Sequence, residues 1–526
     1  MREKQIYARP PEYPETWGDD GQFSQNQNWG NQANANYNNS RYNDEGKPNP
    51  NAQVFDEAFE VPKQKFNDIP FAALFLATVV GFIVVSVISI KAYKSTFNFQ
   101  GTSIYNSGNT FSVNTHTVIL FGFAIVIALV LSVAILMLAR FHAKSFIKFS
   151  MIFNFIFGLG TAIYYLAMRY WSAGIPALVF TIITGISYWT MRKRIPFSAT
   201  VLEIVIDVMK GRPSTLVVSI LGAVVTAAFS CLFTISVVAT YAKYDTNSNN
   251  PNCTSGGCSS GKLVGLIIFL FFAGYYITEV MRNVIHVTIS GVYGTWYYLS
   301  KSDQGEPKLA AWGAFKRAVT YSFGSICLGS LIVTIIQMLR QFCQFLSSPQ
   351  NAMIGGQDGI GAAVMVVMEI LVGFVEWAAR FFNQYAFSYI ALYGESYVQS
   401  AKNTWKLIKH NGMSALVNDC LIGSALLFYC LFVGYAAALF SYLFLRLTQP
   451  EYNSTGGFYA PIVAFTFVIA MQITHVATTV VKSGTSTFFT ALSRDPEVLQ
   501  ACYPQSYNEI FQNYPDVVKK LNPVGV

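Results

Sequence analysis

Ten long apolar runs follow one another between Ile69 and Val481, and they restrict the surroundings in which this chain can fold. A helix needs on the order of 20 apolar residues to cross a hydrocarbon core about 30 Å thick, and only helices and closed barrels satisfy their backbone polar groups there. The runs are too long for barrel strands and lack their alternation. The sequence therefore predicts an all-α, polytopic integral membrane protein with about ten transmembrane helices.

The expected spans cover residues 70–91, 117–139, 146–168, 172–191, 216–241, 263–286, 319–344, 361–386, 414–445 and 458–481. Asp68 and Pro70 are expected to open the first helix as its N-cap and its first-turn proline. After the sixth span the chain stays apolar and aromatic up to Tyr298. This stretch is either a long helix that breaks at Gly291 or Gly294, or a span followed by an interfacial segment.

Composition agrees with a membrane protein, since 53% of the residues are hydrophobic, only 12% are charged and the mean hydropathy is +0.38. A soluble chain of this length could not bury so much apolar surface. The net charge of +8 comes from Lys and Arg residues at the ends of the apolar runs, not from one basic face or tail. This distribution suits orientation in a membrane and disfavours nucleic-acid binding.

Lys and Arg also concentrate in every second gap between the runs. The basic-rich gaps hold Arg192, Lys193, Arg194, Lys210, Arg212, Lys301, Lys308, Lys316, Arg317, Lys402, Lys406 and Lys409. Little more than Lys94, Arg169, Lys243 and Lys262 lies in the others. Because cytosolic loops carry the excess of positive charge, we expect the basic-rich gaps and both termini to be cytosolic. Two sequons, at Asn252 and Asn453, and the cysteine pair Cys253 and Cys258 then fall outside, where glycosylation and a disulfide are possible.

The polar ends of the chain divide it into three parts. Residues 1–68 are rich in Asn, Gln, Tyr, Gly and Pro and are expected to form a disordered cytosolic tail. Residues 69–482 form the predicted transmembrane domain, and 483–526 a cytosolic C-terminal tail. In the first tail, Pro10, Pro11 and Tyr13 have the P-P-x-Y form that WW domains bind, so a WW-domain ubiquitin ligase is a candidate partner. The alternative is that the segment is a linker that no partner recognises.

Catalytic motifs are not found in the sequence. The Gly256–Leu263 segment approaches a phosphate-binding loop, but Leu263 occupies the position where Ser or Thr must hold magnesium. A serine nucleophile elbow, a helical zinc motif and clustered Cys and His ligands are also missing. We therefore expect no enzyme, no cofactor and no metal site.

Three carboxylates inside the spans, Glu279, Glu369 and Glu376, are the strongest functional signal, because burying a charge there costs about 3 kcal/mol on insertion scales. Glu369 and Glu376 are seven residues apart and share one helix face. Either a carboxylate faces a translocation path, or the acids form intrahelical ion pairs with Arg282 and Arg380. Nearby aromatic residues, Tyr275, Trp377, Tyr385 and Tyr389, could hold an organic cation, although Tyr and Trp also form interfacial belts.

Two stretches carry a family resemblance: Arg282–Tyr298, RNVIHVTISGVYGTWYY, and Asn383–Tyr397, NQYAFSYIALYGESY. With the ten-span layout and the Asp495–Leu499 segment, they resemble the choline transporter-like family, and its fungal branch most closely, over roughly residues 69–515. The resemblance implies a facilitative or proton-linked plasma-membrane carrier of choline or related amines. Trp296, Tyr297, Tyr385 and Tyr389 are the candidate substrate-contacting residues within these stretches. The alternative function is a non-transporting membrane scaffold or sensor whose cytosolic tails recruit partners.

Overall fold

The computed structural model describes residues 65–97, 115–244, 259–301, 305–347, 359–411, 413–448 and 459–513, and within these ranges every regular element is a helix. The elements are α3 (Ile69–Phe97), α4 (Thr115–Phe141), α5 (Ala143–Ala167), α6 (Trp171–Met191), the 3-10 turn η1 (Arg192–Arg194), α7 (Ile195–Gly211), α8 (Ser214–Tyr244), α9 (Ser260–Leu299), α10 (Ala310–Val319), α11 (Phe323–Ser347), α13 (Gly359–Tyr393), α14 (Tyr397–Asn411), α15 (Met413–Thr448), α16 (Tyr459–Arg494), α17 (Pro496–Cys502) and α18 (Pro504–Asn513). The predicted all-α class is confirmed.

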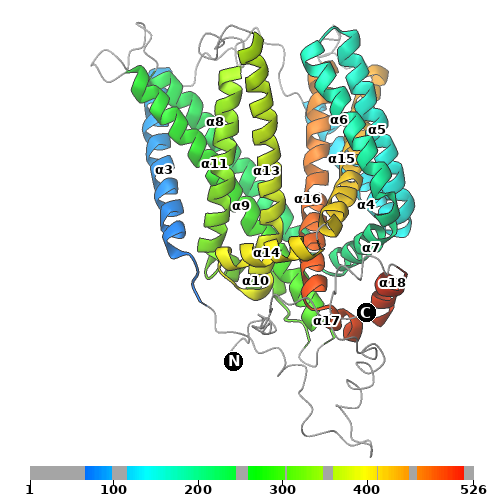
Figure 1. Cartoon of the computed structure of the whole chain (residues 1–526). Coiled ribbons are helices and arrows are strands. Elements are labelled where there is room, and N and C mark those ends of the chain that lie inside the picture. The colour runs from blue at the N-terminus through cyan, green and yellow to red at the C-terminus, as the bar shows by residue number, and fades with distance from the viewer. Residues whose placement is uncertain are drawn as a thin grey trace, which may run out of the picture.

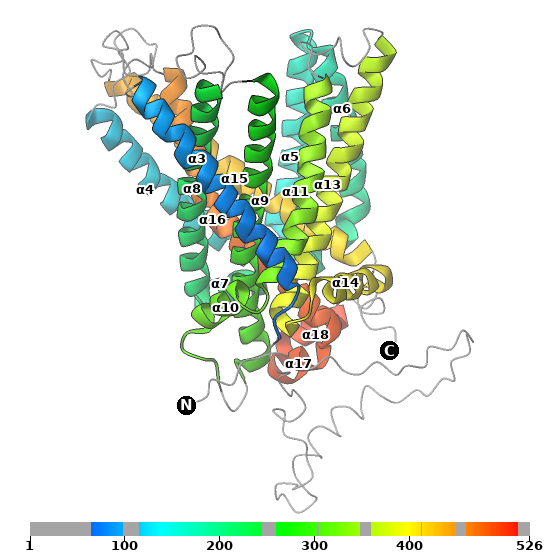
Figure 2. The same ribbon diagram turned by 90° about the vertical axis from the view of Figure 1, so that its left-hand side faces the viewer.

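Nine helical segments among the described residues are long and apolar enough to cross a membrane. They cover every expected span except the eighth, and the fourth of them, Gly174–Gly211, continues through η1 into α7. The eighth expected span coincides with the 35-residue helix α13, which packs antiparallel beside α11 (Figures 1 and 2). The polytopic membrane architecture is therefore confirmed.

The long helices alternate in direction, so that the bundle has two distinct ends (Figure 1). We call the end at which α3 begins and α16 finishes the proximal end, and the opposite one the distal end. The short helices α10, α14, α17 and α18 all lie at the proximal end (Figure 2). The helix ends and turns rich in Lys and Arg, such as η1 and α14, therefore gather at one end, as the alternating charge pattern requires.

The described helices bury two large apolar cores and a small third cluster of Leu120, Leu445 and Ile462. One core joins α3, α11 and the middle of α9, with Phe82, Tyr276 and Ile326 fully buried in it. The other joins α4, α5, α7, α15 and α16. Helices α9 and α13 belong to both, because their proximal segments turn residues such as Tyr293 and Tyr385 into the second core. The two cores are thus tied together at the proximal end.

Helix α9 runs unbroken over 40 residues, so neither expected break, at Gly291 or at Gly294, occurs. A Cβ atom on Gly291 would lie 2.7 Å from the Cβ of Ala314, and one on Gly294 would lie 2.5 Å from Leu392 Cδ2. These glycines let neighbouring helices approach closely rather than bend α9. Helices α13 and α16 also continue past their expected spans, to Tyr393 and Arg494.

Asp68 precedes the first residue of α3, as expected, but its carboxylate serves other helices. Its Oδ2 accepts hydrogen bonds from Ser325 Oγ of α11 at 2.6 Å and from the Tyr397 backbone N–H, the first of α14, at 2.9 Å. Asp68 adopts a left-handed backbone with φ of 54° to reach this position. The start of α3 is thereby linked to the proximal end of α11 and to the first residue of α14.

Several predicted features lie outside the described residues: the tail motif of Pro10, Pro11 and Tyr13, the sequons at Asn252 and Asn453, and the pair Cys253 and Cys258. Glu369 belongs to α13, but its side chain is also outside the described set. These remain predictions.

Candidate functional site

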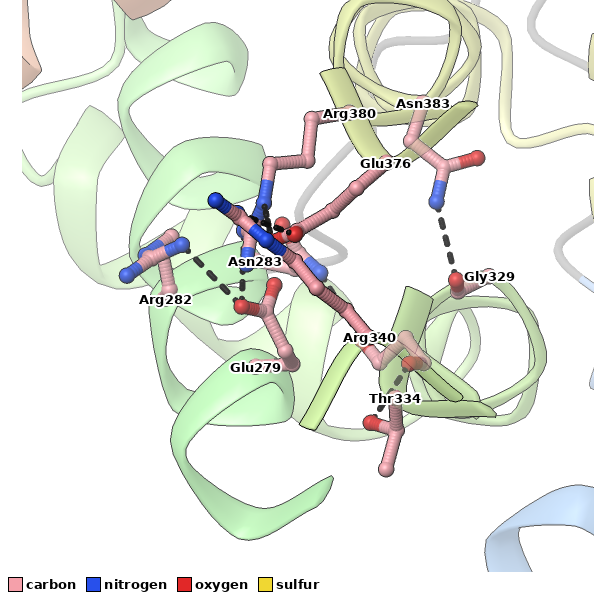
Figure 3. A network of polar contacts seen from close by, with 10 residues as sticks. Glu279, Arg282, Asn283, Gly329, Thr334, Arg340, Glu376, Arg380 and Asn383 are labelled. Atoms are coloured by element: carbon pink, nitrogen blue, oxygen red, sulfur yellow. Dashed lines mark hydrogen bonds and ion pairs between the residues drawn. The ribbon is translucent and has the colours of Figure 1, made fainter. Parts of the chain in front are cut away.

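Glu279 and Glu376 lie at the middle of their helices and meet in one ion cluster (Figure 3). Arg380 bridges them, since its Nη1 donates to Glu279 Oε1 at 2.7 Å and its Nε donates to Glu376 Oε1 at 3.1 Å. Arg282 adds a contact to Glu279 Oε1 at 3.0 Å, and Arg340 adds one to Glu376 Oε2 at 2.9 Å. We call these five residues the arginine–glutamate cluster; it links α9, α11 and α13.

The cluster contains both intrahelical pairs that the sequence offered as one of two alternatives, Arg282 with Glu279 and Arg380 with Glu376. The contacts of Arg380 to Glu279 and of Arg340 to Glu376 cross between helices. The intrahelical interpretation is therefore incomplete, since each carboxylate accepts from a guanidinium on another helix. Such a network reduces the cost of placing charge among apolar helices, and it does so only when the three helices are in register.

Polar side chains of the neighbouring α9, α11 and α13 residues fasten the same region. Asn283 Nδ2 donates to Ser330 Oγ at 2.8 Å, and Asn383 Nδ2 donates to the Gly329 carbonyl at 2.8 Å. Gly329 has no room for a side chain, because a Cβ would lie 2.5 Å from Tyr397 Cε2. The close approach of α11 therefore depends on this glycine.

On the proximal side of the cluster, His286 joins three helices. Its Nε2 donates to the Gln384 carbonyl of α13 at 3.0 Å, and its Nδ1 lies 2.8 Å from Ser483 Oγ of α16. Because the carbonyl can only accept, Nε2 carries the proton, and a neutral ring leaves Nδ1 to accept from Ser483. Every residue of α9 from His286 to Tyr298 is buried, and so is every residue of α16 from Ser483 to Leu492.

The candidate aromatic residues divide into two groups. Tyr275 and Trp377 lie within one turn of the cluster acids, and Trp377 is 44% exposed and stacks on Phe381. Trp296 and Tyr297 are 17 and 18 residues beyond Glu279 on α9, about 26 Å along the helix. They are buried at the proximal end, and the structure does not bring them to the acids.

Tyr385 and Tyr389 also lie at the proximal end. Tyr385 is fully buried against Phe381 and Phe489, and Tyr389 packs on Tyr393. Neither ring forms a cage with Glu376, which is more than two turns away along α13. The eight candidate residues whose side chains the structure describes therefore do not form one site.

The proximal tyrosines surround Asp495, at the end of α16. The hydroxyls of Tyr298 and Tyr393 both donate to Asp495 Oδ2, the latter at 3.0 Å, and Tyr297 donates to the Asp495 carbonyl at 3.0 Å. Arg494 lies 3.8 Å over the Tyr393 ring. Burial raises the pKa of Asp495, while the hydroxyl donors and Arg494 oppose the rise.

Arg494 extends this group to α14. Its Nη1 contacts Glu395 Oε1 at 3.4 Å, and Asn403 Nδ2 of α14 donates to the other oxygen of Glu395 at 2.8 Å. We call the set of Tyr297, Tyr298, Tyr393, Glu395, Arg494 and Asp495 the Asp495 network. It closes the proximal ends of α9, α13 and α16 against one another.

Sequence reasoning missed Arg340, His286 and Asp495. Arg340 was visible as a lone basic residue inside an apolar run, and His286 lay within a family-like stretch. Asp495 opens the family-like Asp495–Leu499 segment, but it follows the last expected span, and its burial depends on the continuation of α16 to Arg494. Among the described residues no group of His, Cys, Asp and Glu could hold a metal ion.

Comparison with known proteins adds independent information. The family model described as "Plasma-membrane choline transporter" matches residues 175–497. The chain is 54% identical to Protein PNS1 of Debaryomyces hansenii over 90% of this chain and 92% of that protein. It is 54% identical to Protein PNS1 of Candida albicans, over 90% and 91% of the two chains, and 50% identical to that of Saccharomyces cerevisiae, over 90% and 88%.

Proposed function

Because this chain belongs to the plasma-membrane choline transporter family, and to its fungal branch, we propose that it is a secondary carrier, facilitative or proton-linked, of choline or a related organic amine at the plasma membrane. The observation that supports this proposal best is the arginine–glutamate cluster at mid-length of α9 and α13. Charged groups among apolar helices typically mark a substrate or ion pathway.

The difference between the two ends supports a carrier rather than a scaffold. Distal to His286 the cluster arginines keep exposed surface, whereas proximal to it the three helices are completely buried against one another. In a carrier that opens alternately to each side, one closed end and one accessible end define a single conformation of the transport cycle. A scaffold has no need of partly exposed charges at this depth.

We place the proximal end in the cytosol, because the basic-rich helices and turns lie there. Exposed Trp312 of α10 and Trp405 of α14 suit a position in the headgroup region of the same leaflet. Asn252 and Asn453 would then face outside. Loss of a glycan from the Asn453→Gln variant, seen as a mobility shift, tests this orientation, and a glycan on a sequon engineered into the α13–α14 connection would overturn it.

With this orientation the Pro10–Tyr13 motif is cytosolic, and we propose that a WW-domain ubiquitin ligase binds it and drives internalisation. Tyr13→Ala should lengthen the surface lifetime without changing transport per molecule. Unchanged turnover, with no WW domain retained by a peptide of residues 9–14, would remove this partner.

Uptake of labelled choline into liposomes that contain the purified full-length protein tests the carrier function. We expect saturable uptake and counterflow that protein-free liposomes lack. If neither choline nor ethanolamine nor any other amine moves, and deletion of residues 1–68 reproduces the loss-of-function phenotype, the scaffold or sensor is the better reading. Current without saturation would instead indicate a channel.

A further inference from the structure

The accessible part of the arginine–glutamate cluster is its positive part. The side chains of Glu279 and Glu376 are only 4% and 10% exposed, whereas those of Arg282, Arg340 and Arg380 are 51%, 40% and 28% exposed. Each carboxylate already accepts from two guanidinium groups. A molecule that reaches the cluster therefore meets N–H donors before it meets a carboxylate oxygen.

These donors lie close to the point where α9, α13 and α16 meet at His286. Arg282 is one turn distal to His286 on α9, and Arg380 is one turn distal to Gln384 on α13. On α16, Lys482 adjoins Ser483 and is exposed, and its carbonyl accepts from Gln384 Nε2 at 3.2 Å. Arg282, Arg380 and Lys482 therefore all lie within about one helical turn of the point where α9, α13 and α16 meet.

The three arginines and Lys482 carry four positive charges against two carboxylates, which leaves a net charge of +2. Such a surface repels a simple organic cation and attracts an acidic group.

An aromatic face adjoins the cations. Trp377, Arg380 and Gln384 are spaced i, i+3 and i+7 and so lie on one face of α13, the face whose Gln384 contacts α16. The exposed indole of Trp377 can accept a quaternary ammonium over its ring. The guanidinium groups beside it can hold a phosphate or carboxylate through paired N–H donors.

We propose that the preferred ligand of this site is a zwitterion, an organic amine that carries a phosphate or carboxylate, with its acidic group on Arg282, Arg380 and Lys482 and its ammonium on Trp377. This proposal rests on the carrier function and names its substrate class. It differs from the expectation based on the acids, in which a carboxylate binds the ammonium directly. The arginines neutralise both acids and reverse the charge that the ligand meets.

The test uses purified full-length protein in liposomes, with choline, phosphocholine and glycine betaine as separate labelled substrates and as competitors. Phosphocholine supplies the phosphate and glycine betaine the carboxylate, so the two arms identify the acidic group. We expect at least one of them to have a half-saturation concentration roughly tenfold below that of choline. Inorganic phosphate should compete with it weakly.

Two variants test whether the cations bind the acidic group of the ligand. Lys482→Gln removes one of the cations without breaking any of the cluster ion pairs, and Arg282→Gln leaves Glu279 its contact with Arg380. Each should raise the half-saturation concentration of the zwitterion roughly tenfold and lower that of choline, because the repulsion of a simple cation decreases. Arg282→Lys should recover part of the affinity. Arg446→Gln on α15, far from the cluster along the sequence, is the matched control.

The outcomes separate the two proposals. Saturable choline transport with no competition from phosphocholine or glycine betaine refutes the zwitterion and leaves the carrier function standing. If nothing is transported, but phosphocholine or glycine betaine still raises the melting temperature of the wild-type protein and not that of Lys482→Gln, the carrier function fails and the binding site stands. Equal loss of choline and zwitterion transport in both variants would mean that the cations only maintain structure, and would overturn the inference.

Discussion

The arginine–glutamate cluster and the Asp495 network both bury carboxylates beside arginines, yet they satisfy them in different ways. In the cluster every described partner of Glu279 and Glu376 is a guanidinium, and the arginines stay partly exposed. In the network, Asp495 is held by tyrosine hydroxyls, and Arg494 is only 5% exposed and covered by the Tyr393 ring. The first arrangement leaves donors for a ligand, whereas the second leaves almost none.

This difference assigns separate roles to residues that the sequence grouped together. Tyr297, Tyr385 and Tyr389 pack the proximal end, while Trp377 lies beside the accessible charges. Aromatic density near an acid is thus insufficient evidence for a cation cage. The hydroxyl or ring must also have surface left after the helices have packed.

The largest effect is expected from Arg380→Ala, which removes the bridge between Glu279 and Glu376. Each acid then retains one guanidinium, and breaking a buried charged network typically costs about 3–5 kcal/mol. The thermal unfolding temperature in detergent should fall strongly, and transport should be lost. Arg446→Ala, which removes a guanidinium that donates to Tyr442 on its own helix, should leave both nearly unchanged. An unaltered melting temperature in Arg380→Ala would mean that the cluster contributes no stability.

Glycine substitutions compare the packing of the two ends. A Cβ on Gly484 of α16 would lie 2.4 Å from Tyr293 Cζ, and Tyr293 is held by a hydrogen bond to the Val205 carbonyl. Gly484→Ala should therefore destabilise the protein by about 3 kcal/mol, through overpacking. Gly265→Ala on the distal part of α9 meets nothing within 4 Å and should be neutral or stabilising by up to about 1 kcal/mol. Similar melting temperatures for the two variants would contradict the difference in packing between the ends.

Arg494→Gln should open the proximal end and leave the ion pairs of the arginine–glutamate cluster intact. It removes the cation stacked on Tyr393 and the pair with Glu395, at a cost of about 2 kcal/mol for a desolvated site. We expect a cysteine placed at the buried Ser388, 3.0 Å from Ser486, to react with maleimide roughly tenfold faster in this background. Arg494→Lys should give an intermediate rate. An unchanged labelling rate would show that Arg494 does not hold the proximal ends of α9, α13 and α16 together.

The smallest effect concerns Tyr397, whose hydroxyl donates to Asn383 Oδ1 at 2.6 Å at the proximal end. Burial raises its pKa to about 12. The folded state thus holds the phenolic proton more tightly than the unfolded state, so this stabilisation is complete below pH 10, the ordinary value, and is lost as the pH rises towards about 12.

Tyr397→Phe should therefore lose about 1 kcal/mol near neutral pH, the value of one hydrogen bond, and should show a shallower decline in melting temperature above pH 10 than the wild type. Tyr164→Phe, at an exposed distal position, is the matched control and should reproduce the wild-type pH profile. Parallel alkaline profiles for Tyr397→Phe and wild type would exclude Tyr397 as a contributor.

Much of the fold was accessible from local sequence, because hydropathy and helical periodicity act within one segment. The spans, the all-α class and the pairs Arg282–Glu279 and Arg380–Glu376 all follow from residues at most one turn apart or from uninterrupted apolar runs. The continuation of α9 through Gly291 was harder, since a glycine permits a bend and close packing equally well.

The amino-acid sequence alone determined which segments cross the membrane, which gaps carry positive charge and which acids lie among apolar residues. Only the tertiary structure decided that Arg340 and Arg380 reach acids on other helices, that Asp68 caps α14, and that Asp495 lies among tyrosines. The physical reason is that such contacts depend on the axial register and rotation of helices relative to each other. Many side chains distributed over the two cores set that geometry together, and no short segment encodes it.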